Sequence, residues 1–359
     1  MIIDLIELQN FRNYENIVLE PDRGINIFYG DNGQGKTNIL ESICVGATTK
    51  SHRNARDKDM IKFGCDEAHI RTGVNKDDIN IRIDIHLKKN KSKGIAINRS
   101  PIKKAADLFG ILNVVIFCPE NLNIISDGPA ERRRFMDMEL CQLDKIYLSD
   151  LVNYNKVLTQ RGKLLKDMYS NPSLKSTLDV WDEQLINYGR RIIKRRREFI
   201  DNIKEIVEKK HKFISGCDEN LHIKYEPDTD DSFFADDLFK CRDRDIRLAQ
   251  TSVGPHKDDI SFCIDEMDIR KYGSQGQKRT AALSLKLSEI DFVTEMIHDK
   301  PVLLLDDVLS ELDRKRQILL LNSIEDIQTF MTCPMLDDVI KENISVDKTF
   351  NIQGGSIIM

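Results

Sequence analysis

The amino-acid sequence predicts an α/β fold that carries a mainly helical insertion. Near the N-terminus, a strand-like run at 25–29 leads through a glycine-rich loop into a helical segment at 38–43. Far downstream, the apolar run 301–305 is typical of a strand buried on both faces of a parallel sheet. Between these segments, the pattern at 128–212 is helical. Together these observations predict one domain built from both ends of the chain, interrupted by a helical domain.

A phosphate-binding loop is predicted between the first of these strands and its helix. The segment 30–37 matches the pattern G-x-x-x-x-G-K-[ST] at all of its fixed positions, which are Gly30, Gly35, Lys36 and Thr37. Asp31, Asn32, Gly33 and Gln34 occupy the variable positions. Backbone N–H groups and the positive end of the helix dipole form a concavity for phosphates in such loops. Lys36 would reach the β- and γ-phosphates of ATP, and the Thr37 hydroxyl would ligate Mg²⁺. A flexible glycine turn is the alternative, but the flanking strand and helix favour nucleotide binding.

The second half of an ATP site is predicted where the downstream strand ends. Two carboxylates, Asp306 and Asp307, follow the apolar run directly. Open α/β sheets bind ligands at the C-terminal ends of their strands. We assign the Mg²⁺ to Asp306, directly or through water, and the polarisation of an attacking water to Asp307. A core strand that ends in an acidic turn is the alternative interpretation.

A third element lies between the first two, at 272–279, and opens a helical stretch at 280–290. Small residues at a helix N-terminus again indicate phosphate contact. Ser274 supplies a hydroxyl group, and Gly273 and Gly276 permit a close approach of the backbone. Taken alone, the segment is also compatible with a solvated loop and helix cap, but its position just before the strand that ends in Asp306 favours a functional role.

The order of these parts resembles the ABC-type ATPase heads of the SMC-like branch. The phosphate loop, the Ser-x-Gly-Gln element at 274–277, the Leu-Leu-Leu-Asp-Asp strand and Ser310-Glu311-Leu312-Asp313 occur in that family's order. Within this branch the sequence is similar to the RecF family of bacterial recombinational repair proteins. Four further segments carry that similarity: 8–14, 117–122, 129–135 and 254–259. The resemblance implies an ATPase head with a mixed sheet, an antiparallel layer and an inserted compact α-helical lid.

The resemblance also implies roles for particular residues. Arg12 and Asn13 are expected to approach the nucleotide phosphates. The Ser274 loop, with Gly276 and Gln277, is expected to meet the γ-phosphate bound by an opposite subunit. The segment 310–313 matches the loop that lines the dimer interface in such heads.

Two positions depart from the family's usual pattern. Glu120 lies where many relatives carry a glutamine that senses the metal. The usual switch histidine after the next strand is not visible, and Thr332 is the candidate that takes its place. The departures favour a slow ATPase that is used as a switch.

Periodicity assigns the remaining segments. Strict alternation at 79–87 predicts a half-buried, antiparallel strand. The runs 95–98 and 114–117 suggest further strands that resemble the antiparallel layer of such a head. A break at 171–173 divides the helical region into an antiparallel helix pair, too short for long coiled-coil arms. The expected domains are the N-terminal part of the head at 1–125, the helical lid at 126–247 and the C-terminal part of the head at 248–359.

Several basic segments are candidates for contact with DNA phosphates. The densest lies at 190–197, where one broad helix face would carry Arg190, Arg191, Lys194, Arg195 and Arg197. Such a face would bind duplex DNA in a salt-sensitive way without reading bases. An ordinary solvated face paired with nearby acids is an equal alternative. A second candidate is the segment 50–58, with Lys50, His52, Arg53, Arg56 and Lys58. A third comprises Arg132, Arg133 and Arg134, for which pinning the lid to the head is an equal alternative.

Composition limits the remaining possibilities. The chain of 359 residues has a formal net charge of −5, so any affinity for nucleic acid must come from a local basic patch. Its eight cysteines are scattered without a C-x-x-C pair, which argues against a zinc site or a disulfide framework. No apolar run is long enough to cross a bilayer, so we expect no membrane partner and a location in the cytosol.

The resemblance extends to partners. It implies an ATP-dependent homodimer on double-stranded and gapped DNA that, with RecO and RecR, promotes RecA loading on single-stranded DNA. Two other classes stay open: the ATPase subunit of a transporter and a nucleotide-held scaffold that binds protein alone.

Overall fold

The computed structural model describes residues 1–216, 218–324, 326–336 and 338–358. These residues form two compact units. Unit 1 comprises Met1–Leu122 and Glu289–Met359, and unit 2 comprises Asn123–Ser288. The division differs from the expected domains because residues 248–288 belong to unit 2. They do so since the strand β10 (Asp259–Ile264) pairs with β9 (Leu221–Glu226) from the lid region.

Unit 1 contains a mostly parallel sheet with the strand order β15-β14-β3-β13-β12-β8. Its strands are β3 (Ile25–Tyr29), β8 (Val114–Phe117), β12 (Val302–Asp306), β13 (Thr329–Cys333), β14 (Lys348–Gln353) and β15 (Ser356–Ile358). Every residue of β12 is buried, and its neighbours β13 and β8 run parallel to it. The prediction of a buried parallel strand is therefore confirmed.

The prediction that the run 114–117 belongs to the antiparallel layer is wrong. As β8 it pairs in parallel with β12 and lies in the mostly parallel sheet, not in the antiparallel one. The physical reason is that all four of its residues are apolar and buried, which suits a strand covered on both faces.

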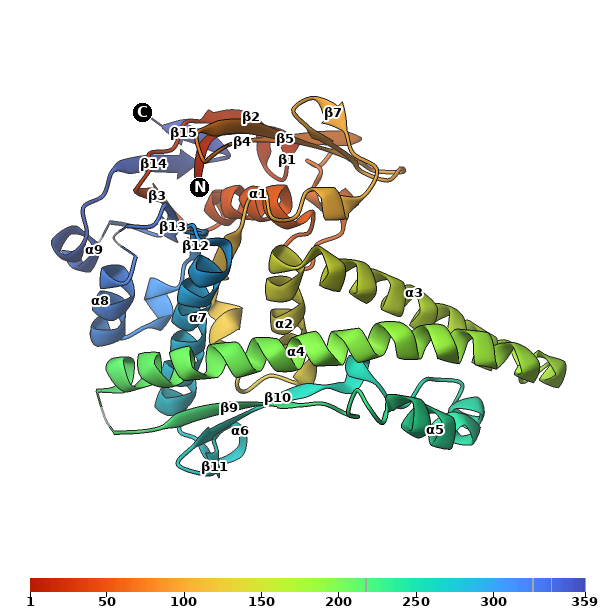
Figure 1. Ribbon diagram of the computed structural model, residues 1–359. Coiled ribbons are helices and arrows are strands. Elements are labelled where there is room, and N and C mark those ends of the chain that lie inside the picture. The colour runs from red at the N-terminus through yellow and green to blue at the C-terminus, as the bar shows by residue number, and fades with distance from the viewer. Residues whose placement is uncertain (217, 325, 337, 359) are drawn as a thin grey trace. The chain divides into compact units, whose positions relative to one another are not determined.

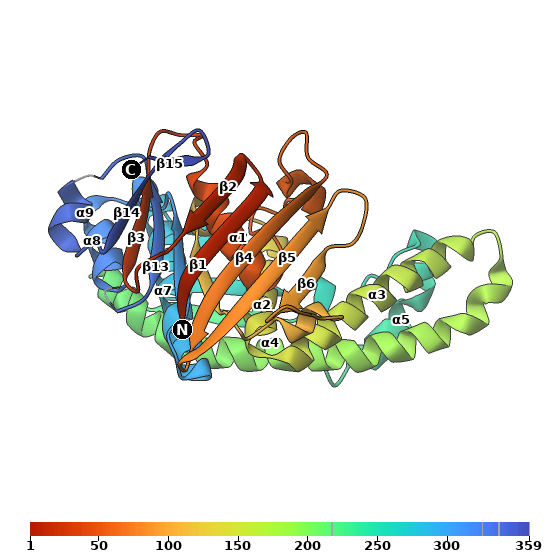
Figure 2. The same ribbon diagram turned by 90° about the horizontal axis from the view of Figure 1, so that it is seen from above.

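The second sheet of unit 1 has the order β2-β1-β4-β5-β6-β7 and is antiparallel throughout (Figure 2). Its strands are β1 (Ile2–Phe11), β2 (Tyr14–Leu19), β4 (Glu67–Lys76), β5 (Ile79–Lys88), β6 (Gly94–Ile97) and β7 (Ser100–Pro101). The predicted alternation at 79–87 is confirmed, because Ile83, Ile85 and Leu87 are buried while the residues between them are not. One face of this sheet is thus apolar and the other is polar.

Helix α1 (Lys36–Thr48) lies beneath the antiparallel sheet (Figure 1). One apolar cluster joins Ile39 and Ile43 of α1 to Ile85 of the antiparallel sheet and to Phe28 and Leu304 of the parallel sheet. The helix that begins at the phosphate loop is therefore fixed by packing on both sides. The other helices of unit 1 are α8 (Arg314–Asn322), α9 (Asp338–Asn343) and the short 3₁₀ turns η1 (Asp57–Met60), η2 (Ala105–Asp107), η3 (Pro119–Asn123) and η6 (Leu309–Glu311).

Unit 2 is mainly helical. Its helices are α2 (Pro129–Leu143), α3 (Lys145–Asp167), α4 (Leu178–Ser215), α5 (Phe234–Leu248) and α6 (Ile269–Tyr272), together with the start of α7 (Gln275–Ile297), which ends in unit 1. The 3₁₀ turn η4 (Pro172–Thr177) separates α3 from α4, and the two helices lie side by side as the predicted antiparallel pair (Figure 1). Strands β9, β10 and β11 (Met267–Asp268) form a small antiparallel sheet, and η5 (Pro255–Lys257) precedes β10. Among the described residues, no helix has both the length and the apolarity that a membrane span requires.

Candidate nucleotide site

The loop between β3 and α1 needs glycine where it enters the helix. Gly35 has a φ of 116°, and a Cβ there would lie 2.5 Å from Asn13 Nδ2 and 2.9 Å from the Tyr14 hydroxyl. Lys36 Nζ donates hydrogen bonds to the carbonyl oxygens of Gly30, at 2.5 Å, and Asp31, at 2.8 Å. The ammonium group is therefore held inside the curve of the loop, next to the N-terminal end of α1.

The turn between β1 and β2 fixes the loop from one side. Asn13 Nδ2 donates to the carbonyl oxygen of Gln34 at 2.7 Å, and Asn13 Oδ1 accepts from Asn38 Nδ2 at 2.8 Å. The Tyr14 hydroxyl donates to the carbonyl oxygen of Gly35 at 3.0 Å. Burial raises the pKa of Tyr14, so the hydroxyl stays protonated and keeps its role as donor. Asn13 thus contacts the loop backbone itself, while its predicted contact with phosphate stays a prediction.

A turn near the C-terminus fixes the loop from another side. The backbone N–H of Gly354 donates to Gln34 Oε1 at 2.6 Å, and the N–H of Gly355 donates to the Gln34 carbonyl oxygen at 3.2 Å. Both glycines lie between β14 and β15. No local pattern in the sequence indicates that the turn after β14 contacts the phosphate loop.

The carboxylate at the end of β12 meets the first residues of α1. Thr37 Oγ1 donates to Asp306 Oδ1 at 2.7 Å, and Thr332 Oγ1, on the neighbouring strand β13, donates to the same oxygen at 2.8 Å. Burial tends to raise the pKa of Asp306, but its interaction with His52 and the hydrogen bonds from Thr37 and Thr332 outweigh burial and lower the pKa. The carboxylate is ionised at neutral pH, and hydroxyl and carboxylate oxygens are the ligands that Mg²⁺ prefers. The residues present therefore fit a magnesium site.

Asp307 lies directly beyond this position in a conformation that is unusual for a residue with a side chain. Its φ is 52°, in the left-handed region, and its N–H donates to Thr332 Oγ1 at 2.9 Å. Ser310 Oγ donates to its carbonyl oxygen at 2.7 Å. Burial, and to a lesser extent the charge of Asp306, raise the pKa of the Asp307 carboxyl group. A carboxylate whose pKa is raised is a better proton acceptor.

His52 belongs to this site, although the sequence placed it in a basic surface stretch. The side chain is buried, with Nε2 3.8 Å from Asp306 Oδ2. Burial tends to lower the pKa of His52, but its interactions with Asp306 and Cys44 prevail and raise the pKa to about 9. The imidazolium therefore supplies a positive charge beside the carboxylate of β12. No local pattern in the sequence distinguishes this histidine from the exposed basic residues around it.

Arg12 and Glu120 lie close to the same end of the fold. Arg12 donates two hydrogen bonds to the buried carboxylate of Glu41 on α1, both at 2.7 Å, and a third to the carbonyl oxygen of Asp59 at 2.7 Å. Its predicted approach to phosphate stays a prediction. Glu120 is exposed in η3, just after β8, and β8 neighbours the strand that ends in Asp306. Its role as a metal-sensing group also stays a prediction.

Ser274 caps helix α7 in unit 2. Its backbone N–H donates to Gln277 Oε1 at 3.0 Å, and the N–H of Gln277 donates to Ser274 Oγ at 3.2 Å. This reciprocal pair is a capping box, which satisfies backbone donors at the start of a helix. Gln277 Nε2 also donates to Glu219 Oε1 at 3.1 Å. The cap interpretation is therefore correct, and it leaves the side chain of Ser274 and the backbone of Gly276 exposed at the helix start.

Comparison with known proteins identifies the family of this chain. The family model described as the RecF/RecN/SMC N terminal domain matches residues 2–351. The chain is 60% identical over 357 residues to the DNA replication and repair protein RecF of Agathobacter rectalis, covering 99% of both chains. The chain belongs to the RecF family. It is also 56% identical over 360 residues to the RecF of Lachnospira eligens, covering 100% of this chain and 99% of the relative.

Solved structures agree with this assignment. The chain superimposes with a TM-score of 0.92 on a RecF structure described as the recombination mediator protein RecF-ATP in the RecFOR pathway, at 36% identity. The alignment covers 99% of this chain and 97% of that one. A second such structure, described as RecF-ATPrS, gives the same TM-score at 35% identity. A head of an Smc protein matches with a TM-score of 0.58 at 15% identity, which shows the shared fold alone. This RecF-family chain therefore has an ATPase head of the RecF and SMC type.

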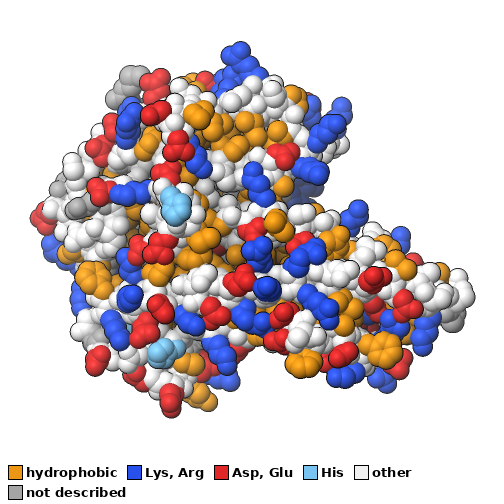
Figure 3. Space-filling view, viewed as in Figure 1, with side chains coloured by type: hydrophobic (Ala, Val, Ile, Leu, Met, Phe, Trp, Pro, Cys, Tyr) orange, Lys and Arg blue, Asp and Glu red, His pale blue; other side chains and the backbone are white. Residues whose placement is uncertain are grey.

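Three arginines of the basic stretch on α4 form ion pairs with acidic side chains. Arg191 forms a two-pronged pair with Asp150 on α3, at 2.7 and 2.6 Å. Arg195 lies 3.3 Å from Asp144, and Arg197 contacts Asp230 and Asp231 at 2.7 and 2.5 Å. Figure 3 shows basic and acidic side chains interspersed along the visible face of this helix. The alternative of a solvated, paired face thus applies to these three arginines.

Other basic residues of this RecF-family chain remain exposed. On α4, Arg190 and Lys194 are exposed, and Arg190 donates a hydrogen bond to the backbone carbonyl of Ser232 at 3.4 Å. In unit 1, Lys50 and Arg53 are exposed. Arg56 is also exposed and pairs with Asp59 at 2.8 Å. These residues stay predicted DNA contacts.

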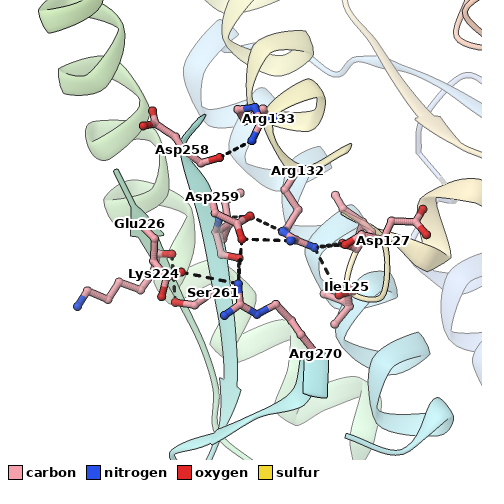
Figure 4. A network of polar contacts seen from close by, with 12 residues as sticks. Ile125, Asp127, Arg132, Arg133, Lys224, Glu226, Asp258, Asp259, Ser261 and Arg270 are labelled. Atoms are coloured by element: carbon pink, nitrogen blue, oxygen red, sulfur yellow. Dashed lines mark hydrogen bonds and ion pairs between the residues drawn. The ribbon is translucent and has the colours of Figure 1, made fainter. Parts of the chain in front are cut away.

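Arg132 and Arg133 hold α2 against the start of β10 (Figure 4). Arg132 is buried and donates two hydrogen bonds to Asp259, at 2.5 and 3.1 Å. Arg270 reaches the same carboxylate at 3.0 Å, and Arg133 donates to the carbonyl oxygen of Asp258 at 2.8 Å. Arg132 is therefore part of the interior of unit 2 and is not available to DNA.

Proposed function

We propose that this chain is an ATP-gated, DNA-binding protein of recombinational repair. The observation that carries the proposal is the 2.7 Å hydrogen bond from Thr37 Oγ1 to Asp306 Oδ1, which joins the phosphate loop to the carboxylate that ends β12. Its membership of the RecF family supports ATP as the nucleotide, since two similar structures are described as RecF-ATPrS and RecF-ATP.

Different residues of unit 1 have different roles in slow ATP hydrolysis. Backbone N–H groups of the loop and the ammonium of Lys36 bind the β- and γ-phosphates. When ATP binds, Lys36 gives up its hydrogen bonds to the loop carbonyl oxygens and donates to phosphate oxygens instead. Bound Mg²⁺, held by Thr37 and Asp306, would neutralise charge on the phosphates. Asp307 orients a water molecule and accepts its proton, as its raised pKa favours.

Thr332 acts by position in this proposal. Its hydroxyl donates to Asp306 and accepts from the backbone of Asp307, so it fixes both carboxylates. Because that hydroxyl is already engaged, we expect it to replace the switch histidine poorly. Glu120, just after the neighbouring strand β8, would take the position of the metal-sensing group. The chain is therefore expected to be a weak, DNA-stimulated ATPase that works as a switch.

Dimerisation would complete the site. The exposed Ser274, with Gly276 and Gln277, would meet the γ-phosphate bound in the loop of a second copy, while Arg12 and Asn13 would approach the phosphates from their own chain. Two nucleotides then join two subunits, and loss of the γ-phosphate separates them. ATP stabilises this dimer because it binds that state more tightly than it binds the monomer.

The dimer would bind double-stranded and gapped DNA through exposed basic residues. Candidates are Lys50, Arg53 and Arg56 in unit 1 and Arg190 and Lys194 in unit 2. Contact with phosphates alone makes such binding salt-dependent and insensitive to sequence. The RecFOR pathway named for similar structures supports RecO and RecR as partners, RecA loading on single-stranded DNA as the outcome, and a location in the cytoplasm.

Duplex binding measured with ATP, with ADP and without nucleotide, over a series of salt concentrations, tests the proposal. We expect the tightest binding with ATP, a parallel rise to dimer mass in light scattering, and a flatter salt slope for the double variant R190E/K194E. A Lys36→Arg variant should lose the effect of ATP on both readouts. Equal duplex affinity in all three nucleotide states would contradict the proposal and favour a scaffold that binds protein alone.

A further inference from the structure

The polar face of the antiparallel sheet carries two histidines in register. On the hairpin of β4 and β5, His69 lies directly opposite His86. Glu67 stands two residues before His69, so its side chain points to the same face of the sheet. This is the face directed away from α1, because the alternate residues Ala68, Ile70 and Ile85 belong to the core cluster that includes that helix. The viewer of Figure 2 looks onto this outer face.

The three side chains already converge. The rings of His69 and His86 stack with centroids 3.9 Å apart and an angle of 22° between their planes. Glu67 Oε2 lies 2.7 Å from His86 Nε2. One potential ligand atom from each residue lies within 4.8 Å of the other two. Each residue sits on a rigid, paired strand, so the arrangement is built by the register of the hairpin.

We propose that Glu67, His69 and His86 form a binding site for a divalent first-row transition-metal ion, with Zn²⁺ as the best match. Zinc binds imidazole nitrogen at about 2.0–2.1 Å and carboxylate oxygen at about 2.0–2.2 Å, so two ligands of one tetrahedral ion lie roughly 3.3 Å apart. Glu67 Oε2 and His86 Nε2 are already closer than this, and the three ligand atoms all lie within 4.8 Å of one another. Small rotations of side chains at the surface would place all three ligand atoms around one ion.

The site is accessible to an ion. Glu67 and His69 are exposed, and Gly94 on β6 pairs with His86 and places no side chain beside it. Lys88, whose Nζ lies 3.9 Å from Glu67 Oε1, is the cation that the metal would have to outcompete.

The ligand set separates this site from the nucleotide site. Thr37 and Asp306 offer oxygen only, which suits Mg²⁺, whereas two imidazoles and a carboxylate suit zinc, cobalt, nickel or copper. Three protein ligands leave a fourth position for water or for a group from another molecule. Metal at the outer face would therefore bind in the presence of excess Mg²⁺.

Titration of the full-length protein with Co²⁺ under excess Mg²⁺ tests the site, because tetrahedral Co²⁺ gives strong visible absorption. Wild-type protein should bind one Co²⁺ per chain at this site, and Zn²⁺ should displace it. His69→Ala and His86→Ala should each weaken that binding at least about tenfold. Glu67→Gln, which preserves the shape of the side chain, should also weaken it. Thermal unfolding without metal confirms that each variant is folded.

His222→Ala is the matched control. Its side chain is 59% exposed and lies 3.9 Å from one carboxylate, that of Glu208. This variant should bind Co²⁺ as the wild type does. Equal binding by the wild type and by the His69 and His86 variants would overturn the proposal and place the ion elsewhere, for example on a cysteine. Absence of tetrahedral Co²⁺ absorption in the wild type would overturn it as well.

Discussion

Replacing Gly355 with alanine tests whether the β14–β15 turn supports the phosphate loop. Gly355 has a φ of 75°, and a Cβ there would lie 2.7 Å from the Asn13 carbonyl oxygen and 3.1 Å from Asn13 Nδ2. A carbon atom cannot approach a backbone oxygen so closely. Either the turn or Asn13 must move, and Asn13 is the residue that holds the carbonyl of Gln34.

The neighbouring Gly354 provides a control of the same kind. Its φ is 55°, but nothing lies within 4 Å of the position of its Cβ. Alanine in the left-handed region costs about 1–2 kcal/mol at either position. Only the Gly355 variant should also lose the hydrogen bond from Asn13 to Gln34, which contributes about 1 kcal/mol. If the lost hydrogen bond destabilises the ATP-binding conformation of the loop by this amount, ATP should bind about fivefold more weakly to G355A than to G354A.

Titration with a fluorescent ATP analogue measures this difference, and thermal unfolding of both variants confirms that each is folded. The comparison between the two variants matters more than either value alone, because it cancels the shared backbone cost. Equal nucleotide affinity of G354A and G355A would refute the inference that the turn positions the loop through Asn13.

Three further predictions concern other parts of the site. Asp307→Asn should slow phosphate release and accumulate the ATP dimer, so turnover at the wild-type rate would remove Asp307 from catalysis. Ser274→Arg should abolish ATP-dependent dimer mass in light scattering while the monomer still binds nucleotide; lost nucleotide binding by the monomer would instead place Ser274 in its own chain's site. In metal-free protein, the raised pKa of His52, about 9, means that its charge stabilises the fold below pH 6.5 and that this contribution is lost as the pH rises through 9. The Tm advantage of wild type over His52→Gln should therefore shrink across that range, and a constant difference would argue against a charged His52.

Much of the nucleotide site could be predicted because its backbone dictates the residues. Gly35 adopts a φ that disfavours a side chain, and it lies against Asn13, so the position demands glycine. The strand that ends in Asp306 could be recognised from its continuous run of apolar residues, because both of its faces are covered. Such local requirements leave a direct trace in the order of residues.

What could not be predicted depends on partners far along the chain. The run 114–117 is apolar in either kind of sheet, and only its pairing with β12 decides which sheet it joins. The sequence does not distinguish Arg197 from its basic neighbours, because its partners Asp230 and Asp231 meet it only in the folded chain. His52 likewise acquires its role from Asp306, which is distant in the sequence. Local sequence patterns do not indicate these long-range contacts.

The interleaved order of the parallel sheet has a consequence for synthesis on the ribosome. Strand β3, which delivers the phosphate loop, is flanked by β13 and β14, both of which are made long after β3. Domains generally fold as units while the chain emerges. The continuous segment Asn123–Ser288 has all of its own strand partners early, whereas the nascent β3 must wait for its two neighbours. A chain released before β13 would thus carry the complete phosphate-loop sequence and still lack the sheet that gives it shape.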